Sequence, residues 1–396
     1  MTRPSLNLRA IIEFVVVAIC TVTFAFTALG IFAALLRPGA AGSRDFAEYW
    51  ASGQQIIHHA NPYDSDAILR LEHSAGYPVG IPAQVMGNPP SVLLLMLPLG
   101  LLDPMAGELL WEMLLLLSLV ASVAMVRFML GSPKNLLHLL AFSFAPALSC
   151  LLAGQVSLFV LLGLVLFLKL HRSHPLLAGA SLWLCLLKPH IFLPFGVVLL
   201  LWICLTRSYW ILAGTTLALG ASSAIATLLN PLVWTQYAQM MSTARIDRLP
   251  VPCLSAVLRQ CVFPHTLWLQ CLPAAVGCAW ALVYFLKRRH EWDWIEDGSL
   301  LMLVSVLVAP YSWFMDQAVL IPALLHGVYF ARSRTLVAIF AMLSAVIEVF
   351  AIRGVELHSA FYLWTAPVWL LWYLCAIWQG DRIQLHDFAT VSGESP

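Results

Sequence analysis

The polar segment 44–63, RDFAEYWASGQQIIHHANPY, follows the first long apolar run of an otherwise very apolar chain. It opens with Asp45 after a single arginine and continues with Glu48 and Tyr49. A carboxylate at the edge of a membrane can serve as a general base that takes the proton of a hydroxyl group. If residues 45–57 form a helix, these three side chains share one face, since positions three and four apart are neighbours. The alternative interpretation is a solvated loop with ordinary helix-capping residues.

Two cations near the ends of apolar runs are candidates for a second kind of chemistry. Lys188 lies in Lys-Pro-His between two short apolar runs, and Arg259 lies in the segment PCLSAVLRQCV. A lysine in such a place could bind the phosphate of a lipid as a point charge. It could equally lay its stem along apolar surface while its ammonium group reaches water. The residues alone leave both interpretations open.

Other polar residues interrupt the apolar runs, and charge in or beside a membrane is costly and often functional. Asp316 stands at the start of an apolar run, where it could bind or orient a sugar or only interact with a helix dipole. Tyr311 precedes it in the segment APYSWFMDQ. Asn88, in Asn-Pro-Pro, and Gln155, after a glycine, are either turn residues or substrate contacts.

The composition indicates which elements must position these residues. Of the 396 residues, 61% are hydrophobic and 10% are charged, and the mean hydropathy is +0.86. A soluble domain carries about 25% charged residues, and about twenty apolar residues cross a bilayer core. We therefore predict an all-α polytopic membrane protein, with a re-entrant or interfacial helix in the short run 91–102. About twelve membrane spans are expected, near residues 11–36, 106–129, 135–152, 155–170, 174–187, 191–206, 209–229, 264–286, 298–310, 317–331, 335–352 and 359–378.

The positions of lysine and arginine predict the orientation of these spans. With the N-terminus in the cytoplasm, most basic residues lie on the inner side, and the cluster Lys287–Arg289 marks the inner end of one span. Residues 37–105 and 230–263 then form two large outer loops, the first with interfacial helices. We expect one transmembrane domain over residues 1–380, a short cytoplasmic tail over residues 381–396, and a location in the inner (plasma) membrane.

Several kinds of site are missing from the sequence. It has no Gly-rich phosphate loop, no HExxH and no GxSxG. The one Asp-x-Asp sequence, at residues 64–66, is better explained as a turn than as a metal-bound nucleotide-sugar site. The nine cysteines form no CxxC, although Cys253 and Cys261 could pair if their loop is outside. We therefore expect no metal and no cofactor, and a net charge of +1 gives no reason to expect nucleic acid.

The order and spacing of several segments resemble the polytopic glycosyltransferases of family 87, in the C-type (GT-C) superfamily. The segments are DFAEYW with ANPY, GNPPSVLLLMLPL, AGQVSLFVLLGLVL, LKPHIFLPFGVVLL, LSAVLR and APYSWFMDQAVLIP, over about residues 44–322. The resemblance implies a GT-C fold and a polyprenyl-phosphate sugar donor, commonly polyprenyl-phosphate mannose. It also implies catalysis on the extracytoplasmic face and an acidic catalytic residue in the first outer loop, a position matched by Asp45.

The chemistry that follows from the resemblance fits these residues. Asp45 would act as general base on an acceptor hydroxyl, in a single displacement that inverts the anomeric carbon. Lys188 and Arg259 would stabilise the departing phosphate. The acceptor would be a glycolipid or a cell-envelope glycan in the membrane. The residues expected to contact substrate are Glu48, Tyr49, Asn88, Gln155, His190, Tyr311 and Asp316.

An alternative function from another class is a lipid-linked sugar flippase or a small-solute transporter. Transporters often carry paired repeats, with interrupted helices at matching positions in the two halves. The polar residues of this chain gather on one predicted side, and its halves do not match. This pattern favours an enzyme that works at one face of the membrane.

Overall fold

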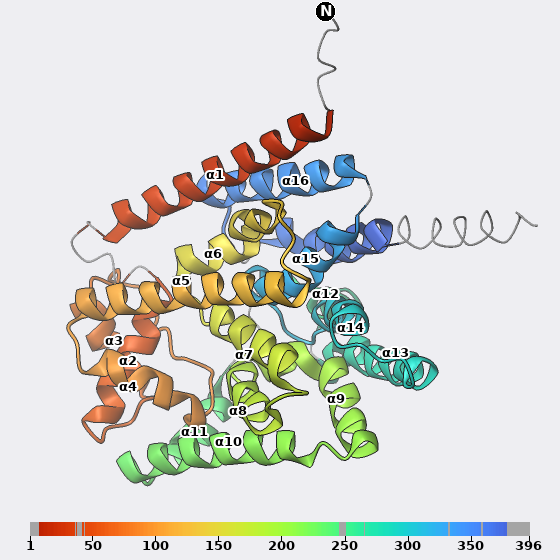
Figure 1. Cartoon of the computed structure of the whole chain (residues 1–396). Helices are drawn as coiled ribbons and strands as arrows, with labels where there is room; N and C mark the ends of the chain where they lie inside the picture. Colours follow the sequence, from red (N-terminus) through yellow and green to blue (C-terminus); the bar gives the residue numbers. More distant parts are fainter. Residues whose placement is uncertain are drawn as a thin grey trace, which may run out of the picture.

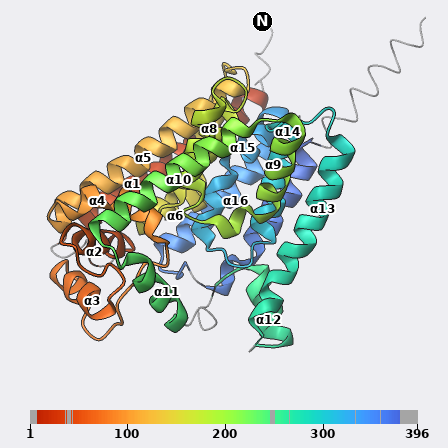
Figure 2. The same cartoon turned by 90° about the horizontal axis from the view of Figure 1, so that it is seen from below.

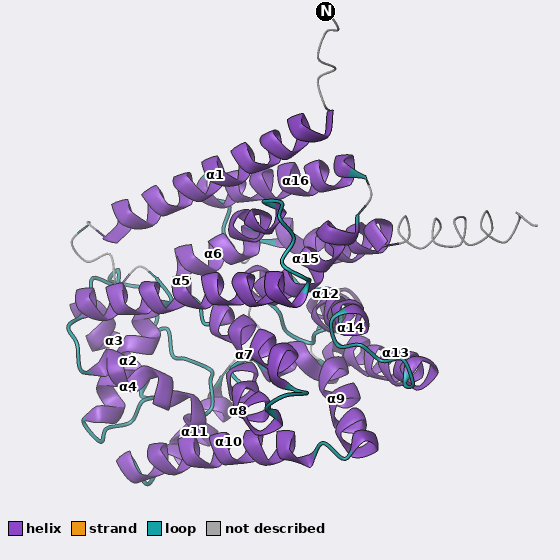
Figure 3. Cartoon of the chain, viewed as in Figure 1, coloured by secondary structure: helices purple, strands orange, loops and turns teal. Residues whose placement is uncertain are grey.

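Helices account for nearly all the regular structure in the computed structural model of this chain (Figures 1 and 3). The structure describes residues 8–377 except 36, 38–41, 43, 245–250, 265, 332 and 358, so the predicted tail 381–396 lies outside the described residues. No β-strand occurs within these described ranges. The α-helices are α1 (Leu8–Leu35), α2 (Phe46–Ile57), α3 (Ser65–Ser74), α4 (Leu93–Gly100), α5 (Pro104–Met129), α6 (Ala145–Ala153), α7 (Ser157–Leu170), α8 (Pro175–Cys185), α9 (Leu193–Thr206), α10 (Tyr209–Leu229), α11 (Val233–Thr243), α12 (Leu254–Val262), α13 (Leu272–Arg288), α14 (Glu296–Leu307), α15 (Ile321–Phe330) and α16 (Arg334–Ile352).

Short 3-10 segments lead directly into several of these helices. They are η2 (Pro90–Val92), η3 (Leu137–Ser143), η4 (Pro189–Phe192), η6 (Leu267–Cys271), η7 (Phe314–Leu320) and η8 (Ala360–Trp364). The last of them opens a final apolar helix, Ala360–Ile377. Proline stands in the first turn of α6, α8, α9 and α15, where its missing N–H removes no helical hydrogen bond.

Seven helices are long and apolar enough to cross a membrane, in the part of the chain that the structure describes. They are Phe14–Ala34, Pro104–Met129, Pro189–Thr206, Tyr209–Leu229, Leu267–Arg288, Arg334–Ile352 and Ala360–Ile377. Each of the twelve predicted ranges contains helix, so the all-α prediction is confirmed. The count of twelve spans is not confirmed, because the remaining five ranges hold shorter helices. The 14 residues of α7, for example, extend about 21 Å, against about 30 Å of bilayer core.

The two predicted outer loops are helical and lie toward the same end of the molecule. The first contains α2, α3 and α4, and the second contains α11 and α12. Figure 2 shows α3, α11 and α12 at one end, below the long helices. Helices α1 and α16 pack together along one side of the bundle (Figure 1). The predicted helix over residues 45–57 is confirmed as α2, and the run 91–102 contains the short helix α4.

The crossing of α2 and α4 fixes the helix that follows Asp45. Gly53 of α2 faces Met96 and Gly100 of α4 so closely that a Cβ at Gly53 would collide with the carbonyl oxygen of Met96. Likewise, a Cβ at Gly100 would collide with the carbonyl carbon and oxygen of Gly53. Two glycines therefore bring the two backbones into contact and set the position of α2.

Replacing Gly53 by Ala is expected to lower stability by about 2 kcal/mol, because the added methyl group forces α2 and α4 apart. Thermal unfolding of the purified protein in detergent measures this change. Gly220→Ala in α10 is the matched control, since a Cβ there meets nothing within 4 Å. Equal melting temperatures for the two variants would show that the close crossing does not hold α2.

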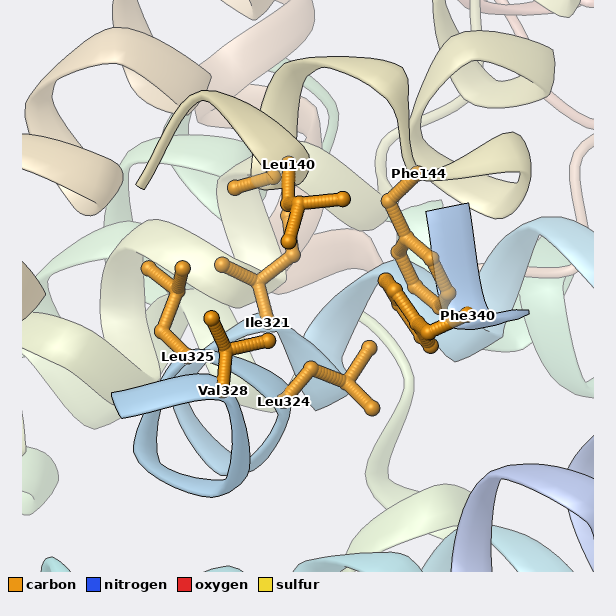
Figure 4. A pocket seen from close by; sticks show the side chains of 8 residues that line it. Leu140, Phe144, Ile321, Leu324, Leu325, Val328 and Phe340 are labelled. Carbon is orange, nitrogen blue, oxygen red and sulfur yellow. The ribbon is translucent and has the colours of Figure 1, made fainter. Parts of the chain in front are cut away.

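Two small cavities in the described part of the chain are lined mainly by apolar side chains. One lies between η3, the start of α6, α15 and α16, where Leu140, Phe144, Ile321 and Phe340 point toward one another (Figure 4). It has room for no more than about one water molecule. This cavity is a packing gap in the apolar core, and the polar residues named above line neither it nor the second cavity.

Candidate active site

Four polar side chains from separate parts of the chain form one hydrogen-bonded row, here called the polar row: Asp45, Gln155, Lys188 and Asp316. Asp45 Oδ2 accepts a hydrogen bond from Gln155 Nε2. Lys188 Nζ donates to Gln155 Oε1 over 3.1 Å and to Asp316 Oδ1 over 2.5 Å. Asp45 precedes α2, Gln155 joins α6 to α7, Lys188 precedes η4, and Asp316 lies in η7. The structure therefore brings together four residues that the sequence had named as candidates.

The orientation of Gln155 in the polar row follows from its neighbours. Its Oε1 accepts from Lys188 and also from the Tyr49 hydroxyl, over 3.1 Å. Because both neighbours donate, the amide oxygen must face them, and the amide nitrogen turns toward Asp45. The preceding Gly154 ends α6 with φ +73°, a left-handed conformation that glycine adopts without strain. This turn carries Gln155 from the end of α6 to the carboxylate.

Asp316 is fully buried and holds the far end of the polar row. Its Oδ1 accepts from Lys188 and from Ser157 Oγ, the latter over 2.8 Å. Its Oδ2 accepts from the backbone N–H of Trp313 over 2.8 Å, which caps the start of η7. The carboxylate therefore caps its own helix and also pairs with Lys188, while a contact between Asp316 and a sugar stays a prediction. A buried charge of this kind needs such partners.

An aromatic group lies beside Lys188. His190 packs edge to face against Tyr311 with ring centroids 5.3 Å apart, and Trp313 Nε1 donates to the Tyr311 hydroxyl over 2.6 Å. His190 Nε2 is buried, and no partner for it occurs in the described part of the chain. A ring nitrogen in this state can bond to an oxygen atom of a substrate.

Asn88 is held by the backbone next to Lys188. Its Nδ2 donates to the carbonyl oxygen of Leu187 over 2.8 Å, and its own carbonyl accepts from the Tyr63 hydroxyl over 2.9 Å. The side chain therefore fixes the turn that carries Lys188. A direct contact between Asn88 and substrate stays a prediction.

Arg259 is buried in α12 and reaches the site through other residues. Its Nε donates to Gln270 Oε1 over 2.8 Å, and its Nη1 donates to the Pro264 carbonyl over 2.7 Å. Gln270 donates in turn to the carbonyl of Pro310, next to Tyr311. Arg259 is thus linked to the aromatic group beside Lys188, and its contact with a phosphate stays a prediction. In the same region, buried Cys253 and exposed Cys261 are free thiols.

The comparison with protein-family models settles the family. The model of glycosyltransferase family 87 matches residues 87–310, more than half of the chain. The chain belongs to glycosyltransferase family 87. With its apolar helices, this family 87 protein is a multi-pass membrane glycosyltransferase. No curated protein and no solved structure matches the chain. The matched range includes Gln155 and Lys188 and leaves out Asp45 and Asp316, so the ends of the polar row are not covered by the family match.

A second buried charge network of the family 87 protein lies directly beside Asp45. The guanidinium of Arg44 donates to Glu108 Oε1 over 2.6 Å and to Glu112 Oε1 through its other terminal nitrogen. Both glutamates lie in the first turns of α5, and all three side chains are buried. One cation therefore serves two carboxylates at the start of a long apolar helix.

The same arginine also binds the end of α6. Its Nε donates to the carbonyl of Leu152 over 2.8 Å, and Nη2 donates to the carbonyl of Leu151. The backbone N–H of Asp45 donates to the next carbonyl, that of Ala153, over 3.0 Å. The last carbonyls of a helix lack hydrogen-bond donors within the helix. Here the Arg44 side chain and the Asp45 N–H donate to them.

The carboxyl groups of Asp45 and Glu48 lie one helical turn apart and differ in their surroundings. Burial raises the pKa of Asp45, while the hydrogen bond from Gln155 and the charges of Lys188 and Arg44 act in the opposite direction. Burial, with the charge of Asp45 added, raises the pKa of Glu48 to about 8. Glu48 is therefore expected to be protonated near pH 7, which agrees with the prediction of Asp45, rather than Glu48, as the base.

Replacing Glu48 by Gln is expected to keep glycosyl transfer within about threefold of wild type at pH 7, since the amide resembles the protonated acid. The raised pKa of Glu48 means that its contribution to stability is complete below pH 4.5 and is lost as the pH rises toward 8. The melting temperature of Glu48→Gln should therefore rise relative to wild type between pH 5 and 8, by about 2 °C or more. The exposed Asp66, replaced by Asn, is the control. If the melting temperature of Glu48→Gln relative to wild type stays constant or falls as the pH rises, the raised pKa of Glu48 is wrong.

Four residues of this site were not named from the sequence: Ser157, Arg44, Glu108 and Glu112. The spacing of Glu108 and Glu112 could have indicated them, because two carboxylates one turn apart in an apolar helix need a cationic partner. The identity of that partner could not be read from spacing, since Arg44 lies far away in the sequence.

Proposed function

We propose that this family 87 enzyme transfers mannose from a polyprenyl-phosphate donor to a glycolipid or cell-envelope glycan. Transfer occurs at the extracytoplasmic face of the inner membrane and inverts the anomeric carbon, with Asp45 as general base. About twelve membrane crossings, including the shorter helices, would place both helical loops on that face. The position of α3, α11 and α12 toward one end of the molecule (Figure 2) supports this topology.

The polar row is the observation that carries the proposal. It joins the predicted base to the predicted phosphate-binding cation through a single side chain, Gln155. An enzyme of this kind needs both groups near one sugar, with the base on one side of the anomeric carbon and the cation at the leaving group. A lone carboxylate or a lone lysine would not meet that requirement.

The reaction can be written with the groups at hand. Asp45 takes the proton of the acceptor hydroxyl as its oxygen bonds to the anomeric carbon. The bond from that carbon to the phosphate oxygen breaks, and the polyprenyl phosphate leaves with the bonding electrons. Gln155 holds Oδ2 of Asp45, so Oδ1 is the oxygen that would face the acceptor.

Lys188 has the means to bind the departing phosphate while it stays in the polar row. An ammonium group has three N–H donors, and two of them are used by Gln155 and Asp316. The third can point to a phosphate oxygen, and His190 Nε2 can supply a further hydrogen bond if protonated there. Fixed donors at a site of developing charge stabilise the transition state.

Proteoliposomes containing the enzyme test the function. They would be supplied with labelled polyprenyl-β-phosphate mannose and a lipid extract from cells that lack the protein. We expect a new labelled mannoside with the α configuration by NMR, and no transfer from a nucleotide sugar. Retention of configuration, or use of the nucleotide sugar alone, would contradict the proposal. Movement of the donor across sealed vesicles without a new glycosidic bond would favour the flippase instead.

A further inference from the structure

We propose that Arg44 is a positioning residue for catalysis, which holds Asp45 in register with Gln155 by clamping the start of α2 to α5 and α6. The Arg44 clamp consists of Arg44, Glu108, Glu112 and the carbonyl groups of Leu151 and Leu152. The inference rests on the proposed role of Asp45 as base.

The first step of the argument concerns geometry. Asp45 and its hydrogen-bond donor Gln155 come from distant parts of the sequence, yet both are tied to the end of α6. Gln155 follows that helix by two residues, and Arg44 with the Asp45 N–H binds the carbonyls of its last three residues. The clamp therefore fixes the base relative to the side chain that orients it.

The second step concerns rigidity. The planar guanidinium of Arg44 offers donors in a fixed fork, and here the fork reaches two helices at once. Glu108 and Glu112 sit on one face of α5, so the arginine cannot turn without losing both carboxylates. A side chain held from several directions fixes the backbone of its neighbour, and that neighbour is the base.

The third step concerns charge. The titratable and charged groups that face Asp45 are Arg44, Glu48 and Tyr49 from its own segment, Lys188 from the turn before α9, and Tyr77 from beyond α3. Behind Arg44 stand Glu108 and Glu112 of α5. Burial raises the pKa of Asp45, and the cation of Arg44 opposes this rise, which favours the deprotonated base.

A purely structural role for the clamp is the alternative, and the experiment separates the two. Arg44→Met alone would leave two buried carboxylates without a cation and could prevent folding. The informative variant is therefore the triple substitution Arg44→Met, Glu108→Gln and Glu112→Gln, which removes every charge of the clamp. Arg44→Lys keeps the charge and loses the fork. Arg288→Met, which breaks an ion pair with Asp297 at 2.7 Å elsewhere in the molecule, is the matched control.

Each variant would be measured in the proteoliposome assay with polyprenyl-phosphate mannose across a range of pH. For the triple variant we expect kcat to fall about tenfold or more with little change in KM for the donor. The acid limb of the kcat profile should move to higher pH, because Asp45 loses the charge of adjacent Arg44, whereas the charges of Glu108 and Glu112 are not among those that shift its pKa. Arg44→Lys should keep the wild-type limb and still lose kcat. Hydrogen exchange of the peptide covering residues 44–52 should be faster in both variants and unchanged in the control.

The result that overturns the inference is a folded triple variant with wild-type kcat, pH profile and hydrogen exchange. Asp45→Asn, measured in the same membranes, tells this failure apart from failure of the proposed function. If Asp45→Asn abolishes transfer while the triple variant is unaffected, the base stands and the clamp has no catalytic role. If Asp45→Asn remains active, the role of Asp45 is wrong, and the inference about Arg44 falls with it.

Discussion

Replacing Asp45 by Asn is expected to lower kcat by about a thousandfold, within the range that a general base contributes. The asparagine keeps the size of the side chain and an oxygen that can accept from Gln155 Nε2, so the polar row should stay in place. What is lost is the group proposed to take the proton of the acceptor. The KM for the donor should change little, because Asp45 is proposed to contact the acceptor.

The measurement is single-turnover transfer of labelled mannose in proteoliposomes, with melting temperature as a check on folding. Glu48→Gln serves as the matched control, since it changes the neighbouring carboxyl group on the same helix to an amide. Transfer by Asp45→Asn within tenfold of wild type, in a protein that melts normally, would exclude Asp45 as the base. A large loss in Glu48→Gln with little loss in Asp45→Asn would move the role to Glu48.

Replacing Lys188 by Met is expected to lower kcat/KM for the donor by about a hundredfold or more, as for other groups that stabilise charge in the transition state. The lysine supplies the cation proposed for the phosphate and also orients Gln155. Its loss leaves the buried carboxylate of Asp316 with hydrogen bonds from Ser157 and the Trp313 N–H in the described part of the chain, and without its lysine. The single variant should therefore lose stability as well as activity.

The double variant Lys188→Met with Asp316→Asn separates these two losses. Without the carboxylate, no unpaired buried charge remains, so the melting temperature should recover toward that of wild type. Activity should stay low, because neither substitution restores a cation at the phosphate. Recovery of transfer together with stability would show that the ion pair is structural and that the phosphate binds elsewhere.

The composition of the chain made part of the site predictable. In a chain with so few charged residues, a charged or amide group beside an apolar run needs a polar partner or a function. Asp45, Gln155, Lys188 and Asp316 were each named on that ground, and the structure joins them. The helix α2 was also predictable, because Asp45, Glu48 and Tyr49 are spaced for one helical face.

The connections among these residues could not be predicted. The sequence presented Lys188 as a phosphate-binding cation or a residue reaching for water, and the structure pairs it with Asp316. That pairing depends on how α7, η4 and η7 pack, which no local pattern specifies. The predicted number of spans stays unconfirmed for a related reason. Apolar content does not tell a full crossing from a short buried helix such as α7, because both need apolar side chains on all faces.

The four residues of the polar row share a position that has an electrostatic consequence. Each stands at or near the beginning of a helix: α2, α7, Pro189–Thr206 and Phe314–Phe330. The unpaired N–H groups at a helix start carry partial positive charge, equivalent to about half an elementary charge per helix. Where four such ends meet, their combined field stabilises the carboxylates of Asp45 and Asp316 and attracts an anionic ligand. The backbone itself would therefore contribute to the affinity for the phosphate of the proposed donor, and this part of the attraction would survive the loss of any single cationic side chain.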